Sequence, residues 1–455
     1  MLKAKNIFLV PALAAATLAI MTGQAVAAKA QVVKNCVKCH QDEAGTVRGF
    51  MKAGSQTDSS FAIDVDGKTV EVSYDGSTKM AKNLTTAKEL ADGKLIMVKV
   101  KEEGGKNVAT ELSYKTPEAY SHQERIIEAA DLAALLKKDP KKANYAILDV
   151  RGVSYYEEGH LPGAIVIPNY RFAKYKDRLP KDKNTLIVTY CNGYTCSMSP
   201  NFYRVLTEGY GYKNVKMFAS GFPAWRVTGQ PIHTEPEFVK YVMDSGQKDA
   251  FVLVDLRSPD KAKAEHIPGA VNLPASDMKA IWQAMPSDKK ARIILYSDKM
   301  AEAEKAMRDL RVNAYDVVSV LAGGVKGWKA KGYPVAANSL VAEVKYKKQL
   351  IPGQISVDEF KAIVKNQPTD KVIVDMRRPD ERAKGKIPGS ISIPVDTLDT
   401  RWTELPKDKE IIIHCQAGPR ASVGFDVLKE HGVKARYLFA GFKWNKDGSY
   451  EIKGK

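Results

Sequence analysis

Ile411-Ile412-Ile413-His414-Cys415 is a run of apolar residues and one histidine that ends on a cysteine. Short, continuous apolar runs are typical of strands that are buried on both faces of a parallel sheet. Gln416-Ala417-Gly418-Pro419-Arg420 follows this run, and a helical stretch, Ala421–His431, comes next. The stretch therefore predicts a strand, a tight loop and a helix. Because ligands bind at the carboxyl ends of strands in such sheets, Cys415 lies where a functional residue is expected.

The same order of features occurs three times along the chain. Each copy has an apolar strand with Asp-x-Arg at its end, a Pro-Gly element, a second apolar strand that ends in Cys or Ser, and a closing glycine and tryptophan. The interval from the Asp to the Pro-Gly glycine is 14 residues in every copy, and the interval to the Cys or Ser is 42, 42 and 40. The marker residues are Asp149, Gly163, Cys191 and Trp225; Asp255, Gly269, Ser297 and Trp328; and Asp375, Gly389, Cys415 and Trp444.

Each copy has the length of one domain, about 105–120 residues. Helical stretches lie between the apolar strands in all three copies. Alternation of strand and helix predicts an α/β fold with a parallel sheet and right-handed crossovers. The sequence therefore predicts three tandem α/β domains.

These motifs resemble those of the rhodanese family of sulfurtransferases. The Asp-x-Arg, the His-Ile-Pro-Gly-Ala type of element, the strand-ending Cys and the closing Gly and Trp carry the resemblance, which covers roughly residues 123–455. The resemblance implies three rhodanese-like domains and transfer of sulfane sulfur through a cysteine persulfide. Small sulfur anions, thiosulfate or polysulfide, are the implied donors. Thiols, cyanide or a partner protein are the implied acceptors.

The third loop resembles an active rhodanese loop. A persulfide cycle needs a nucleophilic thiolate, which the resemblance places at Cys415. A tight loop that enters a helix supplies converging backbone N–H groups and the positive end of the helix dipole, and this environment favours a thiolate. Arg420 can hold an oxyanion such as thiosulfate. The C-x4-R spacing fits sulfur rather than phosphate, because related phosphatases carry one more residue. A buried inert cysteine is the alternative.

The first loop, Cys191-Asn192-Gly193-Tyr194-Thr195-Cys196, has Cys196 where the family has an arginine. The resemblance makes Cys191 a candidate nucleophile, but an anionic donor would lack its expected cation. Cys196 could instead resolve a persulfide or sulfenate on Cys191 and form an intraloop disulfide. A static disulfide and two idle thiols are the alternatives. In the second loop Ser297 replaces the cysteine, and because a hydroxyl carries no stable persulfide, this unit is predicted to be inactive.

Several repeated residues are predicted to support the framework rather than the chemistry. Each Asp-x-Arg lies at a strand end, where the two side chains would tie loops together. The alternating position of His414 predicts burial against a helix. The other framework residues are His160 and His266 of the Pro-Gly elements and the three closing tryptophans, which are predicted to pack.

Residues 1–27 have the pattern of a secretory signal peptide. Lys3 and Lys5 form the charged start, Ile7–Met21 is mostly apolar, and Ala25-Val26-Ala27 is a cleavage site of the A-x-A type. The apolar run is shorter than the roughly 20 residues that span a bilayer, and no later segment could cross a membrane. An uncleaved N-terminal anchor is the alternative. The expected location is the periplasm or the cell exterior.

Composition and charge narrow the class of protein. The chain has 455 residues, 44% of them hydrophobic and 27% charged, which is close to the globular average and argues against a largely disordered chain. Five cysteines are too few for a disulfide scaffold. The formal charge is +17, or +15 without residues 1–27. Since an exported basic protein meets envelope surfaces, acidic redox partners or small anions, we do not expect nucleic acid as a partner.

Cys36-Val37-Lys38-Cys39-His40 is the C-x-x-C-H motif of c-type haem attachment. The thiols of Cys36 and Cys39 would bond the haem vinyl groups, and His40 would be the proximal iron ligand. The sequence thus predicts one covalent haem c. A half zinc site is the alternative, but no second ligand pair lies nearby. The sixth ligand stays open among Met51, Met80, Met97 and His122, of which Met80 and His122 are the leading candidates, or an open or partner-supplied site.

Residues 60–115 have the pattern of β-structure. Two alternating runs flank Asp66-Gly67, and two more flank 103–106, so two hairpins are predicted, with a short helix over Thr85–Ala91 between them. A small β-barrel fits this pattern better than a helical cytochrome. The predicted domains are a signal peptide at 1–27, a β-rich haem domain at 28–121, and rhodanese-like domains at 122–234, 235–340 and 341–455.

The sequence thus predicts an exported sulfurtransferase with Cys415 as the persulfide-bearing nucleophile and a covalent haem that couples it to electron transfer, with a redox or thiol protein as a further partner. One rival is an electron-transfer or scaffold haem protein of the cell envelope, whose rhodanese units only bind partners. A second rival is an oxyanion reductase that uses Cys191 and Cys196 as a redox-active pair.

Overall fold

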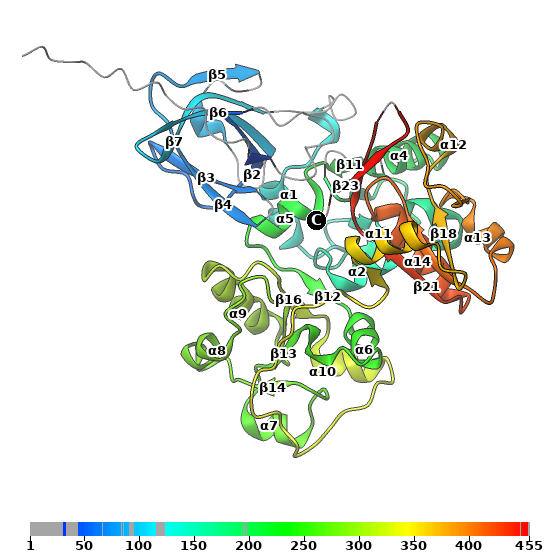
Figure 1. The fold of residues 1–455 in the computed structure, drawn as a ribbon. Coiled ribbons are helices and arrows are strands. Elements are labelled where there is room, and N and C mark those ends of the chain that lie inside the picture. Colours follow the sequence, from blue (N-terminus) through cyan, green and yellow to red (C-terminus); the bar gives the residue numbers. More distant parts are fainter. Residues whose placement is uncertain are drawn as a thin grey trace, which may run out of the picture.

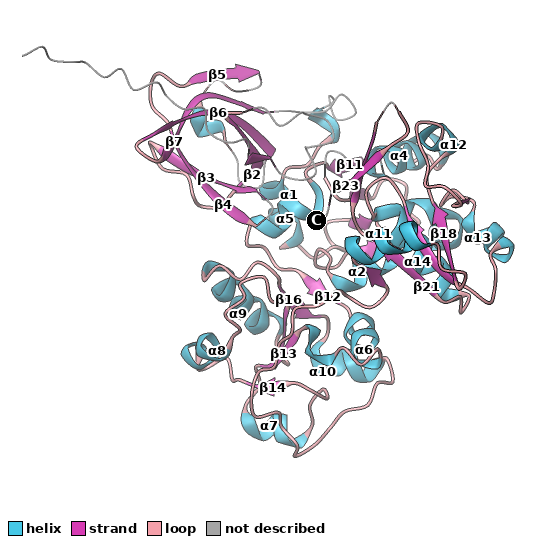
Figure 2. Ribbon diagram, viewed as in Figure 1, coloured by secondary structure: helices cyan, strands magenta, loops and turns pink. Residues whose placement is uncertain are grey.

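The structure is a computed structural model that describes residues 31–32, 44–65, 67–82, 84, 86–90, 95–114, 123–193, 196, 198–445 and 447–453. The predicted signal peptide, the haem motif at 36–40 and His122 lie outside these residues. A β-rich unit is followed by three α/β units, and the first of these lies in the middle of the views, with the β-rich unit at the upper left, the second α/β unit below and the third on the right (Figures 1 and 2). Within the described part of the chain, no helix is both long enough and apolar enough to cross a membrane.

The N-terminal unit (residues 31–114) is built from strands. The pairings β2–β3, β3–β4, β4–β7, β7–β6 and β6–β2 close a ring around apolar side chains such as Phe61 and Val98. The two predicted hairpins are β3–β4 and β6–β7, and the predicted helix over 85–91 is a single 3-10 turn. The elements are β1 (Gln31–Val32), β2 (Thr46–Met51), β3 (Ser60–Val65), β4 (Lys68–Ser73), β5 (Lys79–Lys82), η1 (Ala87–Glu89), β6 (Leu95–Glu103) and β7 (Lys106–Tyr114).

Unit 1 (residues 123–232) has a parallel sheet in the order β11-β10-β8-β9, covered by helices. The apolar run that predicts a buried strand before Cys191 is β10, of which four of five residues are buried. The elements are η3 (Gln123–Arg125), α1 (Ala129–Leu136), β8 (Tyr145–Asp149), α2 (Val153–Glu158), β9 (Ile165–Val166), η4 (Asn169–Arg171), α3 (Phe172–Tyr175), η5 (Lys176–Arg178), β10 (Leu186–Tyr190), α4 (Met198–Arg204), the π-helical turn η6 (Val205–Gly209), β11 (Val215–Phe218) and α5 (Gly221–Val227).

Unit 2 (residues 233–336) repeats this plan with one more strand, in the order β12-β16-β15-β13-β14, and all its pairings are parallel. Its elements are β12 (His233–Thr234), α6 (Pro236–Asp244), η7 (Lys248–Ala250), β13 (Val252–Asp255), α7 (Pro259–Ala264), β14 (Val271–Asn272), α8 (Met278–Ala284), β15 (Ile293–Tyr296), α9 (Met300–Val312), β16 (Val318–Leu321) and α10 (Gly324–Ala330).

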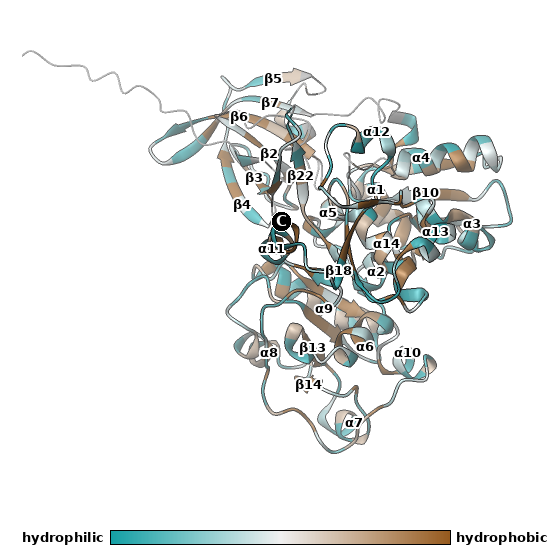
Figure 3. Ribbon diagram, turned by 45° about the vertical axis from the view of Figure 1, so that its right-hand side comes forward, coloured by the Kyte–Doolittle hydropathy of each residue, from teal (hydrophilic) through white to brown (hydrophobic). Residues whose placement is uncertain are grey.

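Unit 3 (residues 351–453) has the parallel order β17-β21-β20-β18-β19, and an antiparallel hairpin takes the place of the closing helix of the other units. The hydrophobic strands of the sheets lie inside the more polar periphery (Figure 3). The elements are β17 (Gln354–Ile355), α11 (Val357–Asn366), β18 (Lys371–Asp375), α12 (Pro379–Arg382), β19 (Ile391–Ser392), α13 (Leu398–Arg401), η8 (Trp402–Glu404), β20 (Glu410–His414), α14 (Pro419–Glu430), β21 (Ala435–Leu438), β22 (Gly441–Trp444) and β23 (Tyr450–Lys453).

The three Asp-x-Arg motifs form buried ion pairs, as the framework interpretation predicts. The closest nitrogen–oxygen distances are 2.6 Å for Asp149–Arg151 and 2.7 Å for both Asp255–Arg257 and Asp375–Arg377. Each guanidinium also donates to a carbonyl eight residues further along, at Gly159, Glu265 and Gly385. The pair therefore joins the end of the strand to the loop that precedes the Pro-Gly element.

Unit 3 packs on unit 1 through a contact surface that we call the seam. The side chain of Arg171, at the end of η4, is 2% exposed and donates to Asp399 and Glu430 of unit 3, both at 2.8 Å. Lys174 also pairs with Glu430, and Ser154 of α2 hydrogen bonds to Asp426 of α14. The rings of Tyr155 and Phe439 lie 5.3 Å apart. Charged and aromatic contacts thus hold together two units that are not adjacent in the sequence.

The buried carboxyl of Asp426 makes the stability of the seam depend on pH. Burial raises its pKa from 3.8 to about 6, so the folded protein keeps a proton that the unfolded chain releases near pH 3.8. Stability therefore falls as the pH rises from about 4 to about 6. We expect Asp426→Asn to stabilise the protein at pH 7 by about 1–2 kcal/mol, because the amide oxygen still accepts from Ser154 and no buried charge forms.

Differential scanning calorimetry of wild type and Asp426→Asn at pH 4 and pH 7 checks this expectation. The gain should be present at pH 7 and absent at pH 4, where Asp426 is protonated. Asp244→Asn is the matched control, since the Asp244 side chain is 60% exposed and its removal should change stability by less than about 0.5 kcal/mol. An equal effect of Asp426→Asn at both pH values would contradict the titration of this group.

Candidate functional site

Cys415 follows β20, and its sulfur lies beneath the loop that leads into α14. Cys415 is 1% exposed. Its Sγ accepts hydrogen bonds from the backbone N–H of Gly418 at 3.1 Å and of Ala417 at 3.4 Å. Pro419 is the first residue of α14, where a missing N–H costs nothing. The loop therefore places two donors and a helix N-terminus at the sulfur, as the sequence predicts.

Contacts at Gly418 and Gln416 fix the shape of this loop. Gly418 has φ +100°, and a Cβ there would lie 2.5 Å from the ring of Phe439, so only glycine fits. The amide of Gln416 donates to the carbonyl of Phe442 at 2.6 Å and accepts from the indole of Trp444 at 3.1 Å. The guanidinium of Arg377 lies 4.1 Å from the Trp444 ring. The hairpin β22–β23 therefore clamps the loop in place.

Trp444 thus differs from its two counterparts in the repeat. Trp225 and Trp328 are fully buried in α5 and α10, where their indoles donate to the carbonyls of Pro231 and Pro334. They are packing residues, as predicted. Trp444 is only half-buried and acts on the loop residue Gln416, which the sequence pattern does not show.

Arg420 lines the same cleft as Cys415, and it is held by a residue that no sequence motif indicates. Its two terminal nitrogens donate to the carboxylate of Glu381 on α12, at 2.5 and 2.7 Å. Burial opposes the charge of Arg420, but these bonds and the nearby Cys415 sulfur raise its pKa above the ordinary value. No spacing rule links position 381 to position 420, so only the fold reveals this pair.

Two tyrosines of unit 1 extend toward the Cys415 loop across the seam. Burial raises the pKa of Tyr155 well above its ordinary value, and the Cys415 sulfur adds to this rise. The hydroxyl of Tyr155 is buried without a hydrogen-bond partner in the described part of the chain. Burial also raises the pKa of Tyr170 to about 12. The charges of Cys196 and Cys415 add to this rise, and the charge of Arg420 opposes it. The site around Cys415 is therefore built from two units.

The first loop holds two thiols in a different environment. Cys191 is 1% exposed, and its Sγ lies 3.6 Å from the carbonyl oxygen of Cys196 and 4.0 Å from that of Gly193. Burial and the neighbouring Cys196 thiol raise the pKa of Cys191. Gly193 has φ +92°, which the turn needs. The Cys191 thiol thus lies near carbonyl oxygens, and hydrogen bonds from Ser199 only partly offset the rise of its pKa, whereas the sulfur of Cys415 accepts from two backbone N–H groups.

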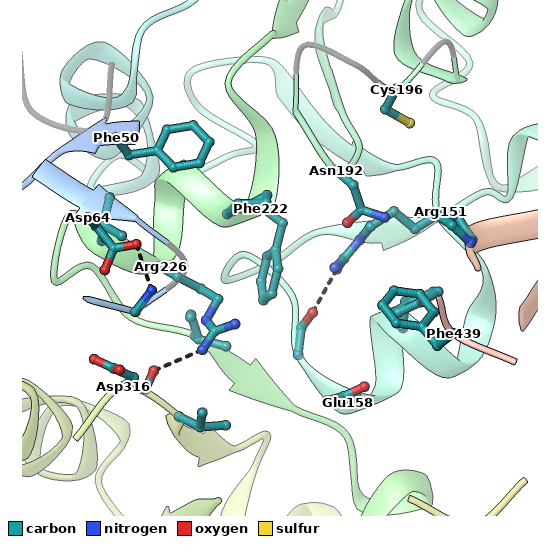
Figure 4. A pocket seen from close by; sticks show the side chains of 18 of the residues that line it. Phe50, Asp64, Arg151, Glu158, Asn192, Cys196, Phe222, Arg226, Asp316 and Phe439 are labelled. Atoms are coloured by element: carbon teal, nitrogen blue, oxygen red, sulfur yellow. Dashed lines mark hydrogen bonds between the residues drawn. The ribbon is translucent and has the colours of Figure 1, made fainter. Parts of the chain in front are cut away.

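Cys196 is the thiol of this loop that reaches the cleft, together with Asn192 (Figure 4). Hydrogen bonds from Cys191 and from the backbone of Asn192 and Met198 lower the pKa of Cys196, although burial alone would raise it. Within the described part of the chain, no disulfide bond involves Cys191, Cys196 or Cys415.

The second loop has no thiol, and its polar groups are used internally. The Ser297 hydroxyl hydrogen bonds to Glu302, and Asp298 pairs with Lys261 at 2.6 Å. Neither Ser297 nor Asp298 lines the cleft that contains the cysteines. The predicted framework histidines are buried as well. His160 and His266 bond to carbonyls four residues earlier, in α2 and α7, and His414 packs against Phe360 and Phe442.

A cleft of about 2390 Å³ connects the cysteine loops of units 1 and 3. Phe50 and Lys52 of the β-rich unit and Arg292 and Arg311 of unit 2 line its other end. Among the lining residues, twelve are lysine or arginine and four are aspartate or glutamate. Because positive side chains in a partly enclosed space attract anions, the cleft suits a small anionic ligand.

The candidate haem residues fall into two groups. Cys36, Cys39, His40 and His122 lie outside the described residues. Met51 and Met97 are buried in the β-rich unit, where the Met97 sulfur accepts from Arg48 at 3.4 Å. Met80 lies on β5 and packs, half-buried, against the same core. These methionines therefore have packing contacts of their own.

Similar proteins include named sulfurtransferases. A sulfurtransferase from Allochromatium vinosum is 35% identical over 63 residues, which are 14% of this chain and 59% of that protein. The mitochondrial thiosulfate sulfurtransferase RDL2 of Saccharomyces cerevisiae is 25% identical over 119 residues, covering 23% of this chain and 80% of that protein. The crystal structure of thiosulfate sulfurtransferase from Pseudomonas aeruginosa matches at 20% identity over 72% of this chain and 68% of that one, with a TM-score of 0.22.

The repeat itself is matched by a family model. The model of the rhodanese-like domain matches residues 128–228, 237–331 and 344–447, which together make up more than half of the chain. The three parallel sheets, each with a loop after its central strand, agree with this match. The chain belongs to the rhodanese family, and it contains three rhodanese-like domains in tandem.

Proposed function

We propose that the protein is an exported sulfurtransferase that carries sulfane sulfur as a persulfide on Cys415, with thiosulfate or polysulfide as the donor. The observation that carries this proposal is the environment of the Cys415 sulfur, which faces two backbone N–H groups at the start of α14. The excess of basic residues around the cleft supports an anionic donor. The named sulfurtransferases among the relatives support the reaction class.

The chemistry follows from the groups around Cys415. Its thiolate attacks the outer sulfur of thiosulfate, the sulfur–sulfur bond of thiosulfate breaks, and sulfite leaves with the bonding electron pair. The N–H groups of Ala417 and Gly418 stabilise negative charge at the loop without having to reorganise. An acceptor such as cyanide or a thiol then removes the outer sulfur, and Cys415 returns as a thiolate.

Arg420 is the cation that we assign to the donor anion. Glu381 fixes the plane of its guanidinium, and the donor shares this cation with Glu381. Glu381 takes two of the five N–H groups of this guanidinium, and the others can donate to the oxygens of an oxyanion. Gln416 positions the loop through the hairpin β22–β23 and does not touch the donor in this scheme.

Export and a covalent haem c are proposed on sequence motifs alone. Cys36 and Cys39 would attach the haem, His40 would be the proximal ligand, and Met80 or His122 are candidates for the sixth. A haem supplies one-electron transfer, which would connect sulfur chemistry to a redox protein partner in the periplasm or outside the cell. Small sulfur anions and a thiol or redox protein are therefore the proposed partners.

Intact mass spectrometry of protein produced in a haem-attaching host tests both halves of the proposal. We expect the mass of one haem on the chain without residues 1–27. Incubation with thiosulfate should then add about 32 Da, one sulfur atom, which a thiol removes. Peptide mapping should place this sulfur on Cys415.

The haem and the sulfur adduct can each be contradicted separately by this measurement. Haem without any sulfur adduct would favour the rival, an envelope electron-transfer or scaffold protein whose rhodanese units bind partners. A sulfur adduct without haem would leave an exported sulfurtransferase and remove the haem from the proposal. A sulfur adduct on Cys191 alone would move the site to unit 1.

A further inference from the structure

The cysteine loops of units 1 and 3 open onto one cleft. Cys196 and Met198 line it from unit 1, and Cys415 and Ala417 line it from unit 3. Tyr170 connects the two loops, because it packs against the core that contains Cys191 and also against the core that contains Cys415. The charges of both Cys196 and Cys415 raise the pKa of this tyrosine. Both thiols therefore lie close to the same side chain.

The seam holds the two loops in a fixed relation. Arg171 follows Tyr170 directly in the sequence, and its buried guanidinium is shared by Asp399 and Glu430 of unit 3. On the other side of the cleft, Tyr155 packs on Phe439, the residue that also limits Gly418. Because the buried Arg171 would lose its carboxylate partners if the two units separated, units 1 and 3 are expected to keep this arrangement during a reaction.

The two loops carry different and complementary reactive groups. The loop of unit 3 has one thiol, two N–H donors at its sulfur and an arginine, which suits it to accept sulfur from an anion. The loop of unit 1 lacks the arginine but has two thiols, and these hydrogen bond to each other. A pair of adjacent thiols can supply two electrons by forming a disulfide.

We propose that sulfane sulfur passes from Cys415 across the cleft to Cys196, and that Cys191 then releases it as sulfide by forming a disulfide with Cys196. This inference rests on the proposed function for the first step, the loading of Cys415. It adds a reductive activity: thiosulfate is converted to sulfite and sulfide.

The steps balance in atoms and electrons. The Cys196 thiolate attacks the outer sulfur of the Cys415 persulfide, a new sulfur–sulfur bond forms, and Cys415 leaves as a thiolate. Cys191 then attacks the inner sulfur of the Cys196 persulfide, the bond to the outer sulfur breaks, and hydrosulfide leaves with the electron pair. Two thiols are oxidised to one disulfide, and the sulfane sulfur is reduced to sulfide. A small dithiol or a dithiol protein must reduce the disulfide before the next turnover.

The electrostatics of the pair agree with this order of steps. Hydrogen bonds lower the pKa of Cys196 against the effect of burial, which favours its thiolate and suits it to attack first. Burial and then the neighbouring Cys196 raise the pKa of Cys191 and keep it protonated at that stage. Once Cys196 carries the sulfur, the negative charge lies on the outer sulfur and no longer on the inner sulfur that Cys191 attacks, so Cys191 can act second.

A single turnover without added thiol tests the relay. Reduced, desalted protein receives one equivalent of thiosulfate, and sulfite, sulfide and intact mass are measured. Wild type should release one sulfite and one sulfide, lose about 2 Da, and give a Cys191–Cys196 cross-linked peptide. Cys196→Ser should release sulfite but no sulfide, and should keep about 32 Da of sulfur on Cys415. Cys191→Ser should also retain the sulfur, with part of it on Cys196.

Matched variants separate this inference from the proposed function. Ser297→Ala, the same loop position in unit 2, should behave as wild type. If wild type keeps the sulfur on Cys415 and releases no sulfide, the relay is wrong and the proposed function stands. If Cys415→Ser still releases sulfide and forms the disulfide, the donor reacts directly with unit 1, and transfer from Cys415 is wrong. If wild type releases no sulfite and gains no mass, the proposed function itself fails.

Discussion

Replacement of Cys415 by alanine is expected to lower thiocyanate formation from thiosulfate and cyanide by at least about a thousandfold. The covalent intermediate is a persulfide, and alanine has no atom that can form it. The thiol at Cys191 cannot substitute efficiently, because its sulfur faces carbonyl oxygens and burial raises its pKa. The measurement is the initial rate of thiocyanate formation at several thiosulfate concentrations.

The control for this expectation is Ser297→Ala in unit 2, which should leave the rate unchanged. Cys415→Ala removes only a small buried side chain, so the Arg171 ion pairs of the seam should persist and the variant should fold. A rate that survives in Cys415→Ala and disappears in Cys191→Ala would assign the nucleophile to unit 1 instead.

Replacement of Asp375 by alanine is expected to destabilise unit 3 by about 3–5 kcal/mol, the usual cost of removing one partner of a buried ion pair. The carboxylate is fully buried and accepts from Arg377, which is also fully buried, and from Arg382. Its loss leaves two guanidinium groups without their counterion. It also loosens Arg377 beneath Trp444, whose indole positions the loop residue Gln416.

Hydrogen exchange with increasing urea, followed by mass spectrometry of peptides from β18 and β20, measures this loss within unit 3. The same peptides report on Asp370→Ala, in which an acidic side chain that is 69% exposed and pairs with Lys371 is removed. That variant should lose less than about 1 kcal/mol. Similar losses in the two variants would contradict the importance that we assign to burial of the Asp375 pair.

Local sequence patterns predict much of the fold. The apolar run before Cys415 is a buried strand, Gly418 and Pro419 form the turn into α14, and the Asp-x-Arg motifs are buried ion pairs. These features depend on residues that are close together in the chain. The spacing of 14 residues from Asp to Gly recurs because one local structure, the strand and the loop tied to it by Arg, recurs.

The parts of the site that the sequence does not predict come from distant segments. Glu381 reaches Arg420 from another helix, and Tyr155 and Tyr170 approach Cys415 from a domain more than 200 residues earlier. No periodicity or motif records which domain faces which. The sequence also gives Trp444 only a packing role, because the hairpin that carries it departs from the helix of the other repeats.

The seam also affects how the protein can change over generations. Arg171 bonds to Asp399, 228 positions later, and to Glu430, 259 positions later, so a mutation of either carboxylate leaves the buried charge of Arg171 less well compensated, and a mutation of Arg171 breaks both pairs. Substitutions at these seam positions in unit 1 and unit 3 are therefore expected to occur together. Unit 2 contributes no residue to these ion pairs, so a substitution in its loop, such as one at Ser297, carries no such penalty.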